Sequence, residues 1–226
     1  MGQTVLCVHE KAEAMNLEKW ELQFESKISE VASSEDPAHD LLHFKRVVGI
    51  AKEICKLENG ILEVVVPAAW LHDLVIVPKN SPFRNQASRL SAQKAIEFLE
   101  SIRYPANYFD QIYHAIEGHS FSANIEVVSL EAKIVQDADR LDGLGAIGIA
   151  RCFATAGLMK RGFYSDDDPF CHSRMPNDSQ FTVDHFFAKL FRTADTMKTE
   201  AGRREAVKRV AYMKDYLAAL RSEITR

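Results

Sequence analysis

The chain has few of the features that mark secreted, membrane-bound or polymer-binding proteins. Its four cysteines are scattered and form no CxxC pair, so neither a dense disulfide framework nor a cysteine zinc site is expected. No apolar run reaches the ~18 residues that a membrane-spanning helix requires, and the first residues lack the pattern of a secretory signal. These absences favour a cytoplasmic protein with no membrane partner.

A large excess of charge of either sign is also missing. The 28 lysines and arginines nearly balance the 32 aspartates and glutamates, which gives a formal net charge of -4. A protein without an overall positive field is not expected to bind a nucleic-acid polymer. Any attraction for an anionic ligand must therefore be local, and we expect a small molecule as the partner.

The chain does contain a helical pattern, in which apolar residues recur at intervals of three and four. His43 shares one helical face with aliphatic residues as far as Leu57, so its imidazole is expected to point inward. No sustained alternation of apolar and polar residues predicts a strand. We therefore predict an all-α protein with helices at residues 10–33, 40–59, 61–75, 86–101, 106–117, 130–142, 144–158, 181–191 and 198–224.

The length of 226 residues is compatible with one large domain, and we predict a single helical domain over residues 1–226. Residues 161–180 have the least regular pattern in the chain and include three consecutive aspartates followed by a proline. We predict an irregular flap in this segment, either ordered or mobile.

Two adjacent polar residues, His72 and Asp73, stand near the end of the apolar segment 61–75. A lone histidine on an apolar face is more often a hydrogen-bonded core residue than a ligand. An ionised carboxylate beside a nearly uniform apolar helix, however, needs a cation or hydrogen-bond donors. With His43 and Asp139, the pair offers two imidazoles and two carboxylates. This set is suited to binding a divalent cation in an enzyme that hydrolyses phosphate esters.

A rival pattern involves His39, which lies four residues before His43. The two histidines superficially match the HExxH signature of zinc proteases, but Asp40 replaces the glutamate that acts as the base there. The shorter side chain disfavours a protease. His39 is then expected to lie outside the ligand set or to contact a phosphate.

The spaced pattern of His43, His72-Asp73 and Asp139 resembles the HD-domain superfamily of metal-dependent phosphohydrolases. The likeness covers most of the chain and is carried by residues 43–47, 69–73, 78–80, 114–122, 132–142, 168–170 and 184–186. These segments are similar to a bacterial and fungal branch whose best understood relatives cleave nucleoside triphosphates, notably deoxynucleotides, to monophosphate and pyrophosphate. The resemblance implies a single HD-domain helical bundle with His43, His72, Asp73 and Asp139 as metal ligands.

The resemblance also bears on the choice between Asp137 and Asp139 as the last ligand. Asp139 is preferred because the Ala138-Asp139 pair is typical of the superfamily's final motif, and Asp142 would share its helical face. Asp137 is then expected to be a surface or outer-shell carboxylate. Mn²⁺ is the expected ion, with Mg²⁺, Co²⁺ and Ni²⁺ as alternatives.

Histidines and cations near these motifs are candidates for contacts with the substrate. His114 and His119 end a helix and could donate to a phosphate or to the leaving oxygen, although local caps are the alternative. Lys79, Arg84 and Arg140 are the nearest cations in the sequence and would neutralise a triphosphate, unless they are solvated surface residues.

The base that orients water has three candidates, Asp73, Asp142 and His119. The resemblance thus implies a metal-dependent enzyme that hydrolyses nucleoside or deoxynucleoside triphosphates to monophosphate and pyrophosphate. The alternatives are an HD-type phosphomonoesterase or phosphodiesterase for another phosphorylated small molecule, and a non-catalytic nucleotide-binding regulatory module. A homo-oligomer is compatible with each of them.

Overall fold

The computed structural model describes residues 16–32, 40–77, 84–120 and 123–224. Throughout these ranges the chain is helical or irregular, and its one extended contact is an isolated bridge between Gly162 and Phe181. The all-α prediction is confirmed. The α-helices are α1 (Leu17–Ser29), α2 (Leu41–Glu58), α3 (Leu62–Leu71), α4 (Ala87–Ser101), α5 (Phe109–His119), α6 (Leu130–Asp142), α7 (Gly145–Leu158), α8 (Phe191–Ala194) and α9 (Glu200–Ile224). Three short segments add to them: the 3-10 turns η1 (Arg84–Gln86) and η2 (Ala106–Tyr108) and the π-helix η3 (Phe186–Leu190).

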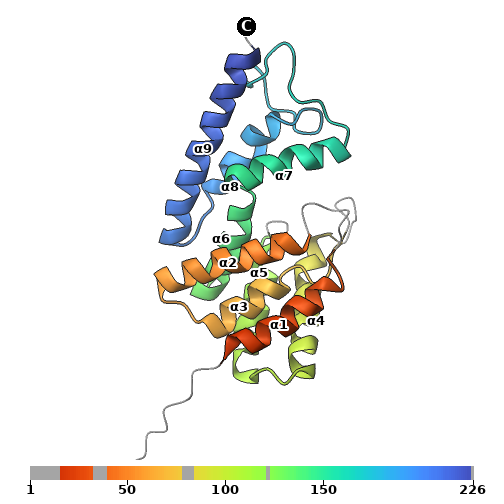
Figure 1. The fold of residues 1–226 in the computed structure, drawn as a ribbon, viewed down its shortest axis with the longest axis vertical. Helices are drawn as coiled ribbons and strands as arrows, with labels where there is room; N and C mark the ends of the chain where they lie inside the picture. The colour runs from red at the N-terminus through yellow and green to blue at the C-terminus, as the bar shows by residue number, and fades with distance from the viewer. Residues whose placement is uncertain (1–15, 33–39, 78–83, 121–122, 225–226) are drawn as a thin grey trace, which may run out of the picture.

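The helices form two groups joined by α6 (Figure 1). Helices α1 to α5 pack together in one half, and α7, α8 and α9 form the other half. Helix α6 packs against α2, α3 and α5 in the first group and against α7, α8 and α9 in the second. Side chains of α6 can therefore contribute to a site between the two groups.

The ends of α2 follow the capping residues that the sequence contains. The side chain of Asp40 accepts a hydrogen bond from the backbone amide of His43 at 2.8 Å, which satisfies one of the first free amides of the helix. Asn59 closes the helix in the left-handed conformation, with φ of 58°. These caps fix His43 in the first turn of α2, and its side chain is 1% exposed, so it points inward as predicted.

Helix α3 is buried from Val64 to Leu71 and continues through Pro67. Proline has no amide to donate to the carbonyl of Glu63, four residues earlier. The hydroxyl of Tyr104 donates to that carbonyl at 2.7 Å instead, so the buried oxygen keeps a partner. The predicted helix over 61–75 was too long, because α3 ends at Leu71 and leaves His72 at its C-terminal cap.

Three other predictions need correction or restriction. Leu57, expected on the buried face of α2, is 63% exposed. The helix predicted for 181–191 starts later, at residues 184–185 just before η3, because Phe181 forms the bridge to Gly162 and residues 182–183 form a turn. The helix predicted for 10–33 is described only as α1, and its first residues lie outside the described part of the chain.

Residues 161–180 contain no helix and are held to the rest of the chain by a partly buried ion pair. Arg174 donates to both carboxylate oxygens of Asp184, at 2.5 and 2.8 Å, and Asp184 is fully buried. The guanidinium of Arg221 on α9 lies 4.7 Å from the ring centre of Phe170. The segment is therefore irregular but packed against its neighbours.

Hydropathy of the helices gives one further result. No single helix in the described ranges is long and apolar enough to cross a membrane. Helices α6 and α7 meet the length and composition criteria only when they are taken together, and this pair is bent by 62°.

Candidate metal centre

Four side chains from three parts of the fold converge where the two groups of helices meet. His43 comes from α2, Asp139 from α6, and His72 and Asp73 from the end of α3. The Nε2 atoms of His43 and His72 are 3.3 Å apart, and Oδ1 of Asp139 lies 3.7 and 3.8 Å from them. One ligand atom each from His43, His72 and Asp73 lies within 4.8 Å of the other two. The structure thus brings together the four residues that the sequence singles out.

The hydrogen bonds of the two imidazoles indicate which nitrogen carries the proton. Nδ1 of His72 lies 2.8 Å from the carbonyl oxygen of Ala69, which can only accept, so Nδ1 donates and Nε2 keeps a lone pair. Burial is the main cause that lowers the pKa of His72 to about 4, so its ring is neutral. Nδ1 of His43 likewise lies 2.8 Å from Oδ2 of Asp142.

This arrangement fits a divalent cation. Two Nε2 lone pairs point at the same small volume, beside the carboxylates of Asp73 and Asp139, and such groups repel one another unless a positive charge lies between them. Neutral imidazoles and carboxylates are ligands for Mn²⁺ and related divalent ions. The donor set therefore makes this cluster a candidate His/Asp metal site.

Asp142 lies behind His43, on the side of the ring away from the cluster. It is 1% exposed and also accepts from Arg46 Nε at 2.6 Å and from Arg151 Nη1 at 2.6 Å. Burial alone would raise the pKa of Asp142, but the hydrogen bonds from His43 and Arg46 hold it well below its usual range. These three contacts favour a role of Asp142 in orienting His43, and its alternative role in orienting water stays a prediction.

We expect the Asp142→Asn substitution to weaken metal binding by about 10- to 100-fold, the usual effect of losing a partner of a ligating histidine. Asparagine keeps the shape of the side chain but leaves Arg46 and Arg151 without their buried counter-charge. Titration of the metal-free protein with Mn²⁺ measures the change. Asp110→Asn, at an exposed position in the first turn of α5, is the control. Equal Mn²⁺ affinity in both variants would refute the role of Asp142.

The two histidines of α5 have different surroundings. Nε2 of His119 lies 3.3 Å from Oδ1 of Asp73, and Nδ1 lies 2.6 Å from the carbonyl of Ile116. Burial alone would lower the pKa of His119, but its contact with Asp73 and the charge of Asp139 raise it to about 9. Nε2 of His114 instead accepts from the amide of Val128 at 3.2 Å. His119 thus lies beside the cluster, whereas His114 makes a local contact, the alternative that the sequence leaves open for it.

Asp137 and Arg140 connect α6 to the segment before α9. Asp137 is fully buried and accepts hydrogen bonds from the amides of Lys198 and Thr199, so the expectation that it lies at the surface was wrong. Burial is the main cause that raises its pKa. Arg140 donates from Nη1 to the carbonyl and the hydroxyl of Thr196, at 3.1 and 2.8 Å.

A pocket of about 1120 Å³ opens beside the cluster, between the two groups of helices. Its lining includes His43, Asp73, His119 and Asp139. It also includes five cationic residues, namely Arg140, Arg151, Arg161, Lys189 and Arg192. The pocket is large enough for a drug-sized ligand, and it combines metal-binding groups with positive charge.

Sequence reasoning found only one of these cations, Arg140. Lys79, the side chain of Arg84 and His39 lie outside the described residues. Arg151 had a signal that could have been used, because it is the only charged residue in the otherwise apolar helix α7. No sequence motif marks Arg161, Lys189 or Arg192. Only the packing of the folded chain brings these residues to the pocket.

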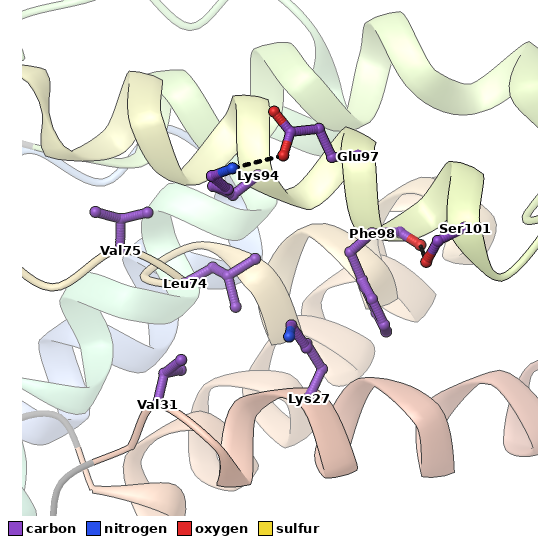
Figure 2. Close-up of a pocket in the computed structure, with 8 residues that line it drawn as sticks. All are labelled: Lys27, Val31, Leu74, Val75, Lys94, Glu97, Phe98 and Ser101. Carbon is purple, nitrogen blue, oxygen red and sulfur yellow. Dashed lines mark hydrogen bonds and ion pairs between the residues drawn. The ribbon is translucent and has the colours of Figure 1, made fainter.

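A second hollow, of about 430 Å³, lies between α1 and α4 (Figure 2). Its lining is mainly apolar, with Leu74 and Phe98 among it. Its two lysines, Lys27 and Lys94, are each paired with a glutamate three residues later, at 2.6 and 2.7 Å. No histidine or aspartate lines it in the described part of the chain, so the chemistry belongs to the larger pocket.

Comparison with known proteins agrees with this site. The HD domain family matches residues 41–144, which include all four residues of the cluster. YpgQ of Bacillus subtilis is 32% identical over 206 residues, which cover 89% of this chain and 92% of YpgQ. The chain therefore belongs to the HD-domain superfamily.

Solved structures support the same assignment. The structure of Bacillus subtilis YpgQ in complex with ADP has a TM-score of 0.69 and 34% identity, and covers 90% of this chain and 97% of that one. An HD-superfamily hydrolase from Bacillus thuringiensis has a TM-score of 0.71 and 30% identity, and covers 92% and 98%. The chain has the fold of HD-superfamily hydrolases.

Proposed function

We propose that this protein is a divalent-metal-dependent phosphohydrolase that cleaves deoxynucleoside triphosphates to monophosphate and pyrophosphate. The observation that carries the proposal is the pair of imidazoles facing two carboxylates at the edge of a cation-lined pocket. The ADP bound to YpgQ supports a nucleotide as the ligand. The proposal includes a cytoplasmic location, with neither a nucleic-acid polymer nor a membrane as partner.

Each residue of the cluster has a proposed role. His43, His72, Asp73 and Asp139 would hold the ion, for which Mn²⁺ is our choice and Mg²⁺, Co²⁺ and Ni²⁺ are alternatives. When bound, such an ion supplies Lewis-acid polarisation of a phosphate group and lowers the pKa of water. Asp142 keeps the proton of His43 on Nδ1, so that Nε2 stays available as a ligand atom.

The residues around the cluster would position the reactants. Nε2 of His119 lies at the pocket wall beside Asp73, where it can donate to a phosphate oxygen. The oxygen of water forms a bond to the α-phosphorus, and the bond from that phosphorus to the bridging oxygen breaks. The electron pair leaves with pyrophosphate, and the protons of water pass to solvent at neutral pH. Arg140, with Lys79 and Arg84 as further proposed contacts, neutralises the phosphate charge.

Incubation of the purified protein with Mn²⁺ and each deoxynucleoside triphosphate tests this proposal, if pyrophosphate and orthophosphate are measured separately. We expect equal amounts of pyrophosphate and monophosphate, no orthophosphate, and no product in the presence of excess chelator. Orthophosphate from monophosphates, with no product from triphosphates, would instead indicate another HD-type phosphoesterase. Nucleotide binding without any metal-dependent product would indicate a regulatory module.

A further inference from the structure

Three of the cations in the large pocket have no ion-pair partner in the part of the chain that the structure describes: Arg161, Lys189 and Arg192. The other two have assigned contacts, since Arg151 donates to Asp142 and Arg140 donates to Thr196. The three cations lie beyond the region that matches the HD domain family, on the loop after α7, on η3 and on α8. They are thus additional to the metal cluster.

Arg161 provides a second, independent sign of a ligand. Its Nε atom is buried and has no hydrogen-bond partner among the described residues. A buried guanidinium donor without a partner is costly and rare, and it is usually satisfied by a water, an ion or a bound molecule. Arg161 lines the pocket and is partly exposed, so a shift of its side chain would bring this donor to an anionic ligand there.

The three cations also lie near one another. Arg161 and Lys189 both contribute to the lowered pKa of His185, after burial, which is the largest cause. Arg192 is three residues after Lys189, so their side chains leave neighbouring turns of the same helical segment. The carboxylate of this wall, Asp178, lies 2.8 Å from Nδ1 of His185 and cancels part of the positive charge.

We propose that Arg161, Lys189 and Arg192 form a distal phosphate subsite, which binds the β- and γ-phosphates of a nucleoside triphosphate and then the leaving pyrophosphate. The identity of the nucleotide rests on the proposed function, whereas the binding of a pyrophosphate group does not. The metal cluster and the subsite line one continuous pocket of about 1120 Å³. The cluster comes from the first group of helices and from α6, and the subsite comes from the second group. A triphosphate held at both places has its α-phosphorus at the cluster.

The subsite makes the enzyme prefer substrates that carry more phosphate groups. Charge-assisted hydrogen bonds to phosphate are worth about 1.5–3 kcal/mol each, so a substrate without β- and γ-phosphates binds at least about tenfold more weakly. The same contacts stabilise the charge that develops on the leaving pyrophosphate. A triphosphate should therefore be preferred over a diphosphate, and a diphosphate over a monophosphate.

The test compares two triple variants that remove the same charge. The subsite variant carries Arg161→Gln, Lys189→Gln and Arg192→Gln, and the control carries Arg204→Gln, Lys208→Gln and Lys214→Gln, at exposed positions of α9 outside the pocket. Calorimetric titration with inorganic pyrophosphate, in metal-free buffer with chelator, gives a readout that does not depend on catalysis. We expect at least about tenfold weaker binding for the subsite variant and a change within about twofold for the control.

Catalysis gives the second readout. With Mn²⁺ present, the subsite variant should lose most of its preference for dATP over dADP, measured as the ratio of their kcat/KM values. Thermal melting of each variant verifies that it is folded. If the triple variant is unfolded, the single variant Arg161→Gln replaces it in both measurements. Unchanged pyrophosphate affinity in a folded subsite variant, or no pyrophosphate binding by the unmodified protein, would overturn the subsite. If pyrophosphate binding is lost as expected but no triphosphate is hydrolysed by the unmodified protein, the subsite stands and the proposed function fails.

Discussion

The His72→Ala protein is expected to lose metal-dependent turnover by a factor on the order of 10³ or more, because the substitution removes a proposed metal ligand. His72 contributes a neutral Nε2 that lies 3.3 Å from Nε2 of His43 and 3.7 Å from Oδ2 of Asp73. Without it the remaining groups no longer surround a shared ion. Asp73→Ala should have an effect of similar size, since it removes a carboxylate from the same group.

Two measurements are needed for this prediction, the metal content of the purified variant and its rate of pyrophosphate release. His172→Ala is the matched control, because that imidazole is exposed and pairs with Arg221 far along the chain from the cluster. We expect His172→Ala to keep both metal and turnover. Full metal content and turnover in His72→Ala would eliminate the proposed centre.

The fold around His72 requires one additional variant. His72 is fully buried, and its ring centre lies 5.2 Å from that of Phe44, so alanine also leaves a cavity. His72→Gln retains most of the volume while removing the imidazole. If His72→Gln melts near the temperature of the unmodified protein but is equally inactive, the loss is due to the missing ligand and not to unfolding.

Signals that lie close together in the sequence predicted the fold well. Asp40 and Asn59 mark the ends of α2 because capping depends on residues next to the helix. The boundaries of α6 follow in the same way from its periodicity, and His43 is buried as its apolar neighbours indicate. The end of α3 was predicted wrongly because a continuous apolar run has no signal that separates a helix from the buried turn after it.

The candidate site was only partly predictable. His43, His72 and Asp73 were singled out because histidine and aspartate are unexpected beside apolar helices, whereas the resemblance to the HD superfamily selected Asp139 over Asp137. Lys189 and Arg192 are ordinary cations in the sequence, and only the packing of η3 and α8 brings them to the pocket. The contacts of Asp142 with Arg46 and Arg151 could not be predicted, because the sequence does not show which side chains surround it.

The different surroundings of Asp137 and Asp139 lead to a second prediction with a large expected effect. The two residues are two positions apart on α6, and a helix turns by about 200° over that distance, so their side chains point in nearly opposite directions. Asp139 faces the histidines of the cluster, at 3.7 and 3.8 Å. Asp137 faces the start of α9, where its carboxylate accepts from two backbone amides and from the hydroxyl of Thr199 at 2.7 Å.

We expect Asp137→Ala to reduce the free energy of unfolding by about 3 kcal/mol, since the buried amides of Lys198 and Thr199 lose their acceptor. The site is tightly packed, because a Cβ at Gly202 would approach the Asp137 carboxylate within 2.4 Å. For a chain of this size the loss corresponds to a melting temperature lower by about 6–12 °C. Chemical denaturation and calorimetry of the metal-free protein measure both quantities.

Asp139→Ala is the matched comparison, on the same helix and with the same loss of one carboxylate. Its side chain is 28% exposed, so we expect a change in stability below about 1 kcal/mol together with a loss of Mn²⁺ binding. Working without metal is essential, because an ion that binds only the folded state would itself raise the stability of the unmodified protein. The opposite pattern, with metal binding lost in Asp137→Ala and stability lost in Asp139→Ala, would transfer the ligand role from residue 139 to residue 137.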